Sequence, residues 1–130
     1  MKLLLDTQVW LWMHLDPSRL SPEVRERFVD SRNELVLSAA SSWEIAIKHS
    51  LGKLPLPEPP ATYIPDRMRR DDVNGLDVTL VHTLHVATLP HHHGDPFDRL
   101  LVAQAQLEKL PLVTADRHIP RYDVEIVPAV

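Results

Sequence analysis

Four acidic residues stand where strands or helices are expected to end or begin, and together they could hold a metal ion. Asp6 closes the apolar run LLL, and Asp116 closes LVTAD. Glu44 and Asp98 each lie at the start of an expected helix. Four carboxylates within a few ångströms repel one another, and a hard divalent cation removes that conflict. Oxygen ligands favour Mg²⁺ or Mn²⁺ over zinc, and such a site suits phosphoryl chemistry through a metal-activated water.

The elements around these residues predict how they come together. Short, continuous apolar runs at residues 3–5, 35–37 and 112–114 are typical of strands buried on both faces. Further strands are expected at 76–80 and 124–127. The expected helices are 7–15, 21–30, 41–51, 63–70, 81–89 and 98–109, with Pro65 tolerable only in a first turn. This alternation predicts a single α/β domain over residues 1–130, with three α/β/α layers and a central, mainly parallel sheet. Ligands bind beyond the carboxyl ends of such strands, where the acidic residues would meet.

Each carboxylate also has an ordinary structural alternative. Ser41 and Glu44 match a capping box, in which the glutamate returns to the cap amide, and Glu44 can pair with Lys48 one turn on. The other acidic side chains could cap a helix or a turn: Asp6, Asp95, Asp98 and Asp116. Independent convergence of four such residues on one edge is harder to explain, so the constellation favours the metal site.

The run HHHGDPFD suggests zinc at first sight, but its histidines are adjacent, so their side chains diverge. The spacings typical of zinc sites, such as HExxH, are missing. We therefore expect His91, His92 and His93 to lie in a solvated loop, where His92 or His93 could contact a substrate phosphate when protonated. Asp98, not the histidine run, is the expected ligand in this segment.

Composition narrows the function classes. The 130 residues include no cysteine, which excludes disulfides and thiolate zinc sites. The first apolar run is too short for a signal peptide, and no run reaches the length of a membrane span, so we expect a cytoplasmic protein without a membrane partner. The net charge of -4 counts against a nucleic-acid binder, unless many of the carboxylates surround cations.

Four blocks carry a resemblance to a known family: MKLLLDTQVWLW, SAASSWEIAIKHSLGKLPLP, HHHGDPFDRLLVAQAQ and LVTAD. In this order they closely resemble PIN-domain ribonucleases, specifically VapC-type toxins of type II toxin–antitoxin pairs. The resemblance implies a PIN-like fold and a Mg²⁺- or Mn²⁺-dependent endoribonuclease. It assigns catalytic and metal-binding roles to Asp6, Glu44, Asp98 and Asp116.

The resemblance also implies partners. These are an RNA substrate, with tRNA or another structured RNA as candidates, a cognate VapB-type antitoxin that occupies the active-site groove, and a second copy in a homodimer. Trp10 is expected in the core, whereas Trp12 could line a groove for an antitoxin helix, which binds through spaced apolar anchors.

A second set of residues is expected near the acidic group. Thr114 matches a family Ser/Thr position near the metal, and Thr7 matches the family residue that follows the first Asp. Asp95 is expected in the loop or behind the ligands. Positive side chains near the acidic residues could hold RNA phosphates: Lys48, Arg99 and Arg117. Gln8 stands where the family often has His, and Gly94 where Arg is common, which affects substrate choice rather than activity.

Two other functions remain to be weighed. A non-enzymatic, receiver-like Mg²⁺ module needs a phosphoacceptor Asp after a middle strand and a Lys after a later one. Here the second strand ends in Ser38-Ala39-Ala40, and no Lys follows residues 112–114. A decayed interaction protein is disfavoured by the complete acidic quartet.

Overall fold

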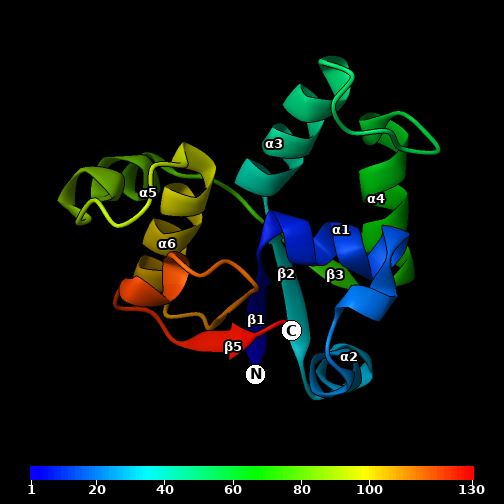
Figure 1. Cartoon of the computed structure of the whole chain (residues 1–130), viewed down its shortest axis with the longest axis horizontal. Coiled ribbons are helices and arrows are strands. Elements are labelled where there is room, and N and C mark those ends of the chain that lie inside the picture. The colour runs from blue at the N-terminus through cyan, green and yellow to red at the C-terminus, as the bar shows by residue number, and fades with distance from the viewer.

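The computed structural model describes residues 1–130 and contains one sheet of five strands (Figure 1). The strands are β1 (Lys2–Leu5), β2 (Glu34–Ser38), β3 (Val73–Leu76), β4 (Leu112–Thr114) and β5 (Ile126–Pro128). Their order is β3-β2-β1-β4-β5, and every neighbouring pair is parallel. The carboxyl ends of all five strands therefore lie along one edge of the sheet.

Helices connect the strands and cover the sheet. They are α1 (Thr7–Leu15), α2 (Pro22–Val29), α3 (Ala39–Ser50), α4 (Pro60–Arg70), α5 (Leu80–His85) and α6 (Pro96–Glu108). Three short 3₁₀ turns are η1 (Pro17–Arg19), η2 (Val86–Thr88) and η3 (Ile119–Arg121). In Figure 1, α1 and α4 lie on one side of the sheet, and α5 and α6 lie on the other. This confirms the predicted three-layer α/β/α class. None of the helices has the length and apolar character needed to cross a bilayer.

The central strand β1 is buried on both faces, as its continuous apolar run predicts. Leu3 and Leu5 pack on the α1 side, in the cluster that contains Trp10. Leu4 points to the opposite face and packs with Val102 of α6. Burying a leucine side chain contributes roughly 1.5–3 kcal/mol, so these layers fix the residue that follows β1 firmly in place.

Some element boundaries differ from those that the sequence predicts. Helix α4 begins at Pro60, which suits the first position of a helix, so Pro65 lies in the helix interior and not in its first turn. The strand expected at 76–80 lies at Val73–Leu76 instead. The reason is Thr79, whose Oγ accepts a hydrogen bond from the His82 amide while the His82 ring accepts one from the Thr79 amide. That capping box commits residue 79 to the start of α5 and ends the strand earlier. The strand expected at 124–127 also differs: β5 begins two residues later and ends one residue later.

Candidate metal centre

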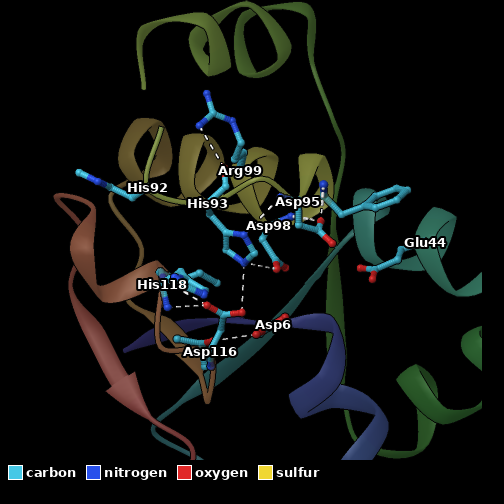
Figure 2. Close-up of polar contacts among 12 residues, drawn as sticks. Asp6, Glu44, His92, His93, Asp95, Asp98, Arg99, Asp116 and His118 are labelled. Carbon is cyan, nitrogen blue, oxygen red and sulfur yellow. Dashed lines mark hydrogen bonds and ion pairs between the residues drawn. The ribbon is translucent and has the colours of Figure 1, made fainter. Parts of the chain in front are cut away.

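Four carboxylates line one hollow at the carboxyl edge of the sheet. Asp6 directly follows β1, Asp116 follows β4, Glu44 projects from α3, and Asp98 projects from α6 (Figure 2). The hollow has a volume of about 290 Å³. Its other walls are mixed and consist of Thr7, Gln8, Leu11, Trp12, Ile45, Lys48, Leu54, Asp95 and Ala115. Segments from both ends of the sequence thus supply one acidic pocket.

Asp6 is buried at the floor of this pocket. The Thr114 hydroxyl donates a hydrogen bond to Asp6 Oδ2 at 2.7 Å, and the same Thr114 oxygen accepts one from the Asp116 amide at 2.9 Å. Burial raises the pKa of Asp6, and the negative charges of Glu44 and Asp116 raise it further, whereas the Thr114 hydrogen bond opposes the rise. The Asp6 side chain makes no capping hydrogen bond to α1, so it contributes to the pocket and does not cap the helix.

Asp98 lies in the first turn of α6, but it is not the cap of that helix. Asp95 is the cap, because its Oδ1 accepts hydrogen bonds from the Phe97 amide at 2.8 Å and the Asp98 amide at 3.0 Å. The helix therefore begins two residues earlier than predicted. Burial raises the pKa of Asp98 to about 7, and the charges of Asp6, Asp95 and Glu44 act in the same direction.

The capping-box alternative for Glu44 is wrong, because α3 begins earlier than the sequence suggests. Strand β2 runs directly into the helix, and Ser38 is the cap, with its Oγ accepting a hydrogen bond from the Ala40 amide at 3.0 Å. Glu44 consequently lies in the second turn, not the first. Ser41 is fully buried and instead accepts a hydrogen bond from the Thr7 hydroxyl at 2.8 Å, which ties α1 to α3. The Thr7 side chain therefore supports the pocket through a contact between helices.

Glu44 has one satisfied carboxylate oxygen and one that is not. Its Oε2 accepts a hydrogen bond from the Lys48 ammonium at 2.5 Å, as the spacing of one helical turn predicts. This bond raises the pKa of Lys48. Glu44 Oε1 is buried and has no hydrogen-bond partner. A buried carboxylate oxygen without a partner is costly, so this oxygen is available to accept a hydrogen bond or to bind a cation.

Asp116 is held in its charged form. Burial alone would raise its pKa, but hydrogen bonds from the His118 and Ile119 amides and from the His93 side chain bring the pKa of Asp116 below its ordinary value. The two amides donate to Oδ1 at 2.7 Å and 3.2 Å. Oδ2, the other oxygen, lies 3.1 Å from His93 Nε2.

His93 belongs to this cluster, contrary to the expectation that the whole histidine run is solvated. Its Nε2 lies 2.9 Å from Asp98 Oδ2 and 3.1 Å from Asp116 Oδ2, and its side chain is only 14% exposed. One nitrogen of His93 and one oxygen from each aspartate lie within 4.8 Å of one another. His92, in contrast, points away from the pocket and packs against Tyr122 (Figure 2). Because three histidines follow one another, the sequence does not show which of their rings turns toward the pocket. The available signal is that His93 precedes the α6 cap by two residues.

The three predicted phosphate-binding residues occupy different environments. Lys48 is half-exposed at the pocket, and Arg117 is exposed next to Asp116. The prediction for Arg99 is wrong: the residue is 8% exposed and directed away from the carboxylates (Figure 2). Its guanidinium donates hydrogen bonds to the carbonyl oxygens of Pro90 at 3.0 Å and Val86 at 3.2 Å, among others, so its donors are committed inside the protein.

Comparisons with known proteins agree with this fold. Residues 3–125 match the family model of the PIN domain. Over 63 residues, the chain is 57% identical to Ribonuclease VapC16 of Mycobacterium tuberculosis (strain ATCC 25618 / H37Rv). That match covers 48% of this chain and 45% of the relative, so it spans less than half the length of that protein. Ribonuclease VapC22 of the same strain is 29% identical over 116 residues, which cover 89% of this chain and 88% of the relative.

Solved structures share the architecture at low sequence identity. The crystal structure of VapBC2 from Rickettsia felis bound to a DNA fragment from its promoter has a TM-score of 0.76 at 15% identity, and the match covers 100% of both chains. DNA-bound VapBC from Salmonella typhimurium has a TM-score of 0.72 at 19% identity, covering 98% of this chain and 97% of the other. These likenesses concern the fold. Because the family model matches nearly the whole sequence, the chain belongs to the PIN domain family.

Proposed function

We propose that this protein is a Mg²⁺- or Mn²⁺-dependent endoribonuclease that acts as the toxin of a type II toxin–antitoxin pair. The observation that carries the proposal is the convergence of Asp6, Glu44, Asp98 and Asp116 on one hollow. The two relatives from Mycobacterium tuberculosis described above are named ribonucleases, which supports the same reaction class. The receiver-like alternative lacks support, because β2 ends at Ser38 without a phosphoacceptor aspartate.

The residues of the pocket fit a hard divalent cation. Glu44 Oε1 is buried without a partner, and burial raises the pKa of both Asp6 and Asp98, as expected of carboxylates that lack a counter-charge. All four predicted ligands offer oxygen, the donor that Mg²⁺ and Mn²⁺ prefer. In this proposal Asp6, Asp98 and Asp116 would hold the ion, and Glu44 would bind it directly or through water.

The chain's own groups divide the remaining work. Thr114 fixes Asp6 and, through the Asp116 amide, the start of the loop after β4. The Lys48 ammonium is bonded to Glu44 and half-exposed at the pocket, so it can approach a phosphate of the RNA backbone. Arg117 offers a second exposed positive charge beside Asp116. When bound, the metal would activate a water molecule and stabilise the charge that develops on the phosphate oxygens.

The proposal includes a VapB-type antitoxin as partner. The pocket combines an acidic floor with an apolar wall formed by Leu11, Trp12 and Leu54. A helix or extended segment with apolar anchors and one basic side chain would complement both parts. The similar solved structures from Rickettsia felis and Salmonella typhimurium are described as DNA-bound VapBC2 and VapBC, and a further similar structure is described as a toxin–antitoxin complex from Klebsiella pneumoniae, which supports a partner of this kind.

The proposal also includes a homodimer. Helix α5 exposes three large apolar side chains, Leu80 at 74%, Val81 at 64% and Leu84 at 65%. Large apolar side chains exposed together on one short helix are consistent with a protein–protein contact. Analytical ultracentrifugation of Leu84→Glu against the wild type would test this part, and an unchanged sedimentation coefficient would contradict it.

The enzymatic proposal is tested with purified protein and a panel of structured RNAs, including tRNA. Cleavage is expected with Mg²⁺ or Mn²⁺, and none is expected with excess EDTA or with Asp6→Asn. The control is Asp30→Asn, an aspartate that pairs with Arg32 after α2 and lies outside the pocket. Cleavage that persists unchanged in EDTA would contradict the metal-dependent mechanism.

A further inference from the structure

The His93 ring bridges two of the carboxylates of the pocket from outside. Nε2 lies 2.9 Å from Asp98 Oδ2 and 3.1 Å from Asp116 Oδ2. The same Asp116 oxygen carries the hydrogen-bonding contact with the ring. In Figure 2, the ring lies between α6 and the loop after β4, with dashed lines to both side chains. His93 therefore contacts residues from two separate segments of the site.

The other ring nitrogen determines where the imidazole hydrogen lies. The backbone amide of Asp95 donates a hydrogen bond to His93 Nδ1 at 3.2 Å. An amide N–H can only donate, so Nδ1 must offer its lone pair. A neutral imidazole has one N–H, which must then be on Nε2. Nε2–H is a donor, and the two groups it faces are acceptors, so every contact of the ring is satisfied by this tautomer.

This tautomer is unsuitable for direct metal binding through Nε2. A metal-bound imidazole nitrogen needs a free lone pair, which would place the hydrogen on Nδ1, against the Asp95 amide. That amide belongs to the residue that caps α6, and its position is set by the helix rather than by a cation. We therefore expect the same amide to donate to the ring when an ion is bound.

Building on the proposed function, we propose that His93 is a positioning residue of the metal site: its Nε2–H holds Asp98 and Asp116 by hydrogen bonds and does not bind the cation. Each carboxylate has a second oxygen. In Asp116, Oδ1 accepts hydrogen bonds from the His118 and Ile119 amides, so the His93 bond orients the remaining oxygen, Oδ2. Hydrogen bonds that hold a metal ligand in position, made by residues that do not contact the metal, commonly contribute 10–100-fold to metal affinity.

Two substitutions separate a donor from a ligand. His93→Gln retains an amide N–H at about the reach of Nε2, whereas His93→Ala removes the donor. Isothermal titration with Mg²⁺ is expected to show a loss of affinity of roughly 10–100-fold for His93→Ala and substantial recovery for His93→Gln. His91→Ala is the control from the same histidine run, since His91 is exposed. Thermal melting of the metal-free variants establishes that each is folded.

A spectroscopic measurement identifies the nitrogen itself. With Mn²⁺ bound, electron spin-echo envelope modulation detects a ¹⁴N nucleus that is directly coordinated, and none is expected from His93. In ¹⁵N-labelled protein, NMR should show the Nε2–H tautomer of His93 both without metal and with Mg²⁺. A directly coordinated nitrogen that disappears in His93→Gln would overturn the inference, as would unchanged Mg²⁺ affinity in His93→Ala. If the wild type binds neither Mg²⁺ nor Mn²⁺, the proposed function falls together with this inference, whereas metal binding that is insensitive to residue 93 removes the inference alone.

Discussion

At neutral pH and without metal, Asp98 is neither fully charged nor fully neutral, because burial and three nearby carboxylates raise its pKa to about 7. In an unfolded chain the ordinary value is about 3.9. A carboxyl group whose pKa is raised by folding stabilises the protein fully below its unfolded pKa, and this contribution is lost as the pH rises through the folded value. The metal-free protein should therefore lose stability between about pH 4 and pH 7 through this residue.

Asp98→Asn should remove this pH dependence. The amide cannot ionise, so the metal-free variant is expected to be more stable than the wild type at pH 8, on the order of 1 kcal/mol. The difference should shrink toward pH 4, where the wild-type carboxyl group is protonated. Thermal melting in EDTA across this range checks the prediction, and cleavage should be lost. A variant that melts much lower than the wild type at pH 8 would show that Asp98 is needed for the helix instead.

Glu44→Gln tests whether the charge of Glu44 acts in the reaction. Because Ser38 caps α3, the substitution leaves the helix start untouched, and the melting temperature should change little. Cleavage should nevertheless fall by at least ~100-fold, the scale of losing one well-placed electrostatic or acid–base group. Glu34→Gln is a matched control at the opposite end of β2, and it should cleave normally. Near-normal cleavage by Glu44→Gln would reduce the site to the three aspartates.

Residue types alone predicted the acidic set but not its surroundings. Asp6 and Asp116 could be named because they follow strands, and parallel strands share an edge. Glu44 and Asp98 were expected at helix starts; Asp98 lies in a first turn, whereas Glu44 lies in the second turn of α3 and still lines the pocket. The inward turn of His93 depends on a single amide of the next segment, and the burial of Arg99 depends on carbonyl groups from two turns. Such contacts leave no periodic signal in the sequence.

At the scale of elements, Arg99 links α6 to segments that lie before and after it in the sequence. Its guanidinium donates to the η2 carbonyl of Val86, to the Pro90 carbonyl and to the Tyr122 hydroxyl, which lies beyond η3. Those segments hold the loop that carries His93. Arg99 thus stabilises the segments around the pocket although it does not line the pocket itself.

Arg99→Lys should destabilise the protein although it keeps the positive charge. A lysine has one nitrogen and cannot reach the several acceptors that the planar guanidinium satisfies, so buried carbonyl groups lose their partners. The expected loss is roughly 2 kcal/mol or more, measured by urea denaturation. Arg117→Lys, at an exposed position, should stay within about 0.5 kcal/mol of the wild type. Unchanged stability of Arg99→Lys combined with weaker RNA binding would restore the original prediction for Arg99.

Element types were easier to predict than element boundaries. Helix α1 and strand β4 have the predicted bounds, because Asp6 and Asp16 flank one and Pro111 precedes the other. The start of α3 was misplaced because Ser38 ends a strand and caps a helix at once, whereas the Ser41–Glu44 pattern looked like the cap. A local sequence pattern predicts an element boundary least well where one side chain belongs to two elements.

For the molecule as a whole, the sheet order places β1 between β2 and β4, so the carboxylates converge only when the entire sheet is assembled. A cation that neutralises them should therefore stabilise the complete fold. Saturating Mg²⁺ or Mn²⁺, at about 100 times the dissociation constant, should add about 2.7 kcal/mol to the free energy of unfolding. Differential scanning calorimetry of the wild type and Asp6→Asn, each with Mg²⁺ and with EDTA, checks this. An equal metal response in both proteins would place the ion elsewhere.

Trp12 gives a test of the proposed partner at the same scale. It is half-buried and lines both the acidic hollow and the adjacent surface with Leu15, Lys53 and Leu54. Trp12→Ala should weaken inhibition by the cognate antitoxin by at least ~10-fold, as expected for an aromatic anchor, and should largely spare cleavage. Val29→Ala, on the exposed side of α2, is the control. Unchanged affinity in a titration with the antitoxin would reject this surface.

The hydrogen bond from Thr114 to Asp6 joins residues 108 positions apart in the sequence. During translation, Asp6 is made long before Thr114 and Asp116. At a synthesis rate of about 5–20 residues per second, roughly 5–20 s separate the two ends of this bond. A growing chain therefore carries an incomplete and unaligned set of carboxylates throughout that interval. If the protein cleaves RNA, it remains harmless to the messenger and ribosome that are producing it until β4 emerges, and an inhibitor made at the same time has that interval in which to fold.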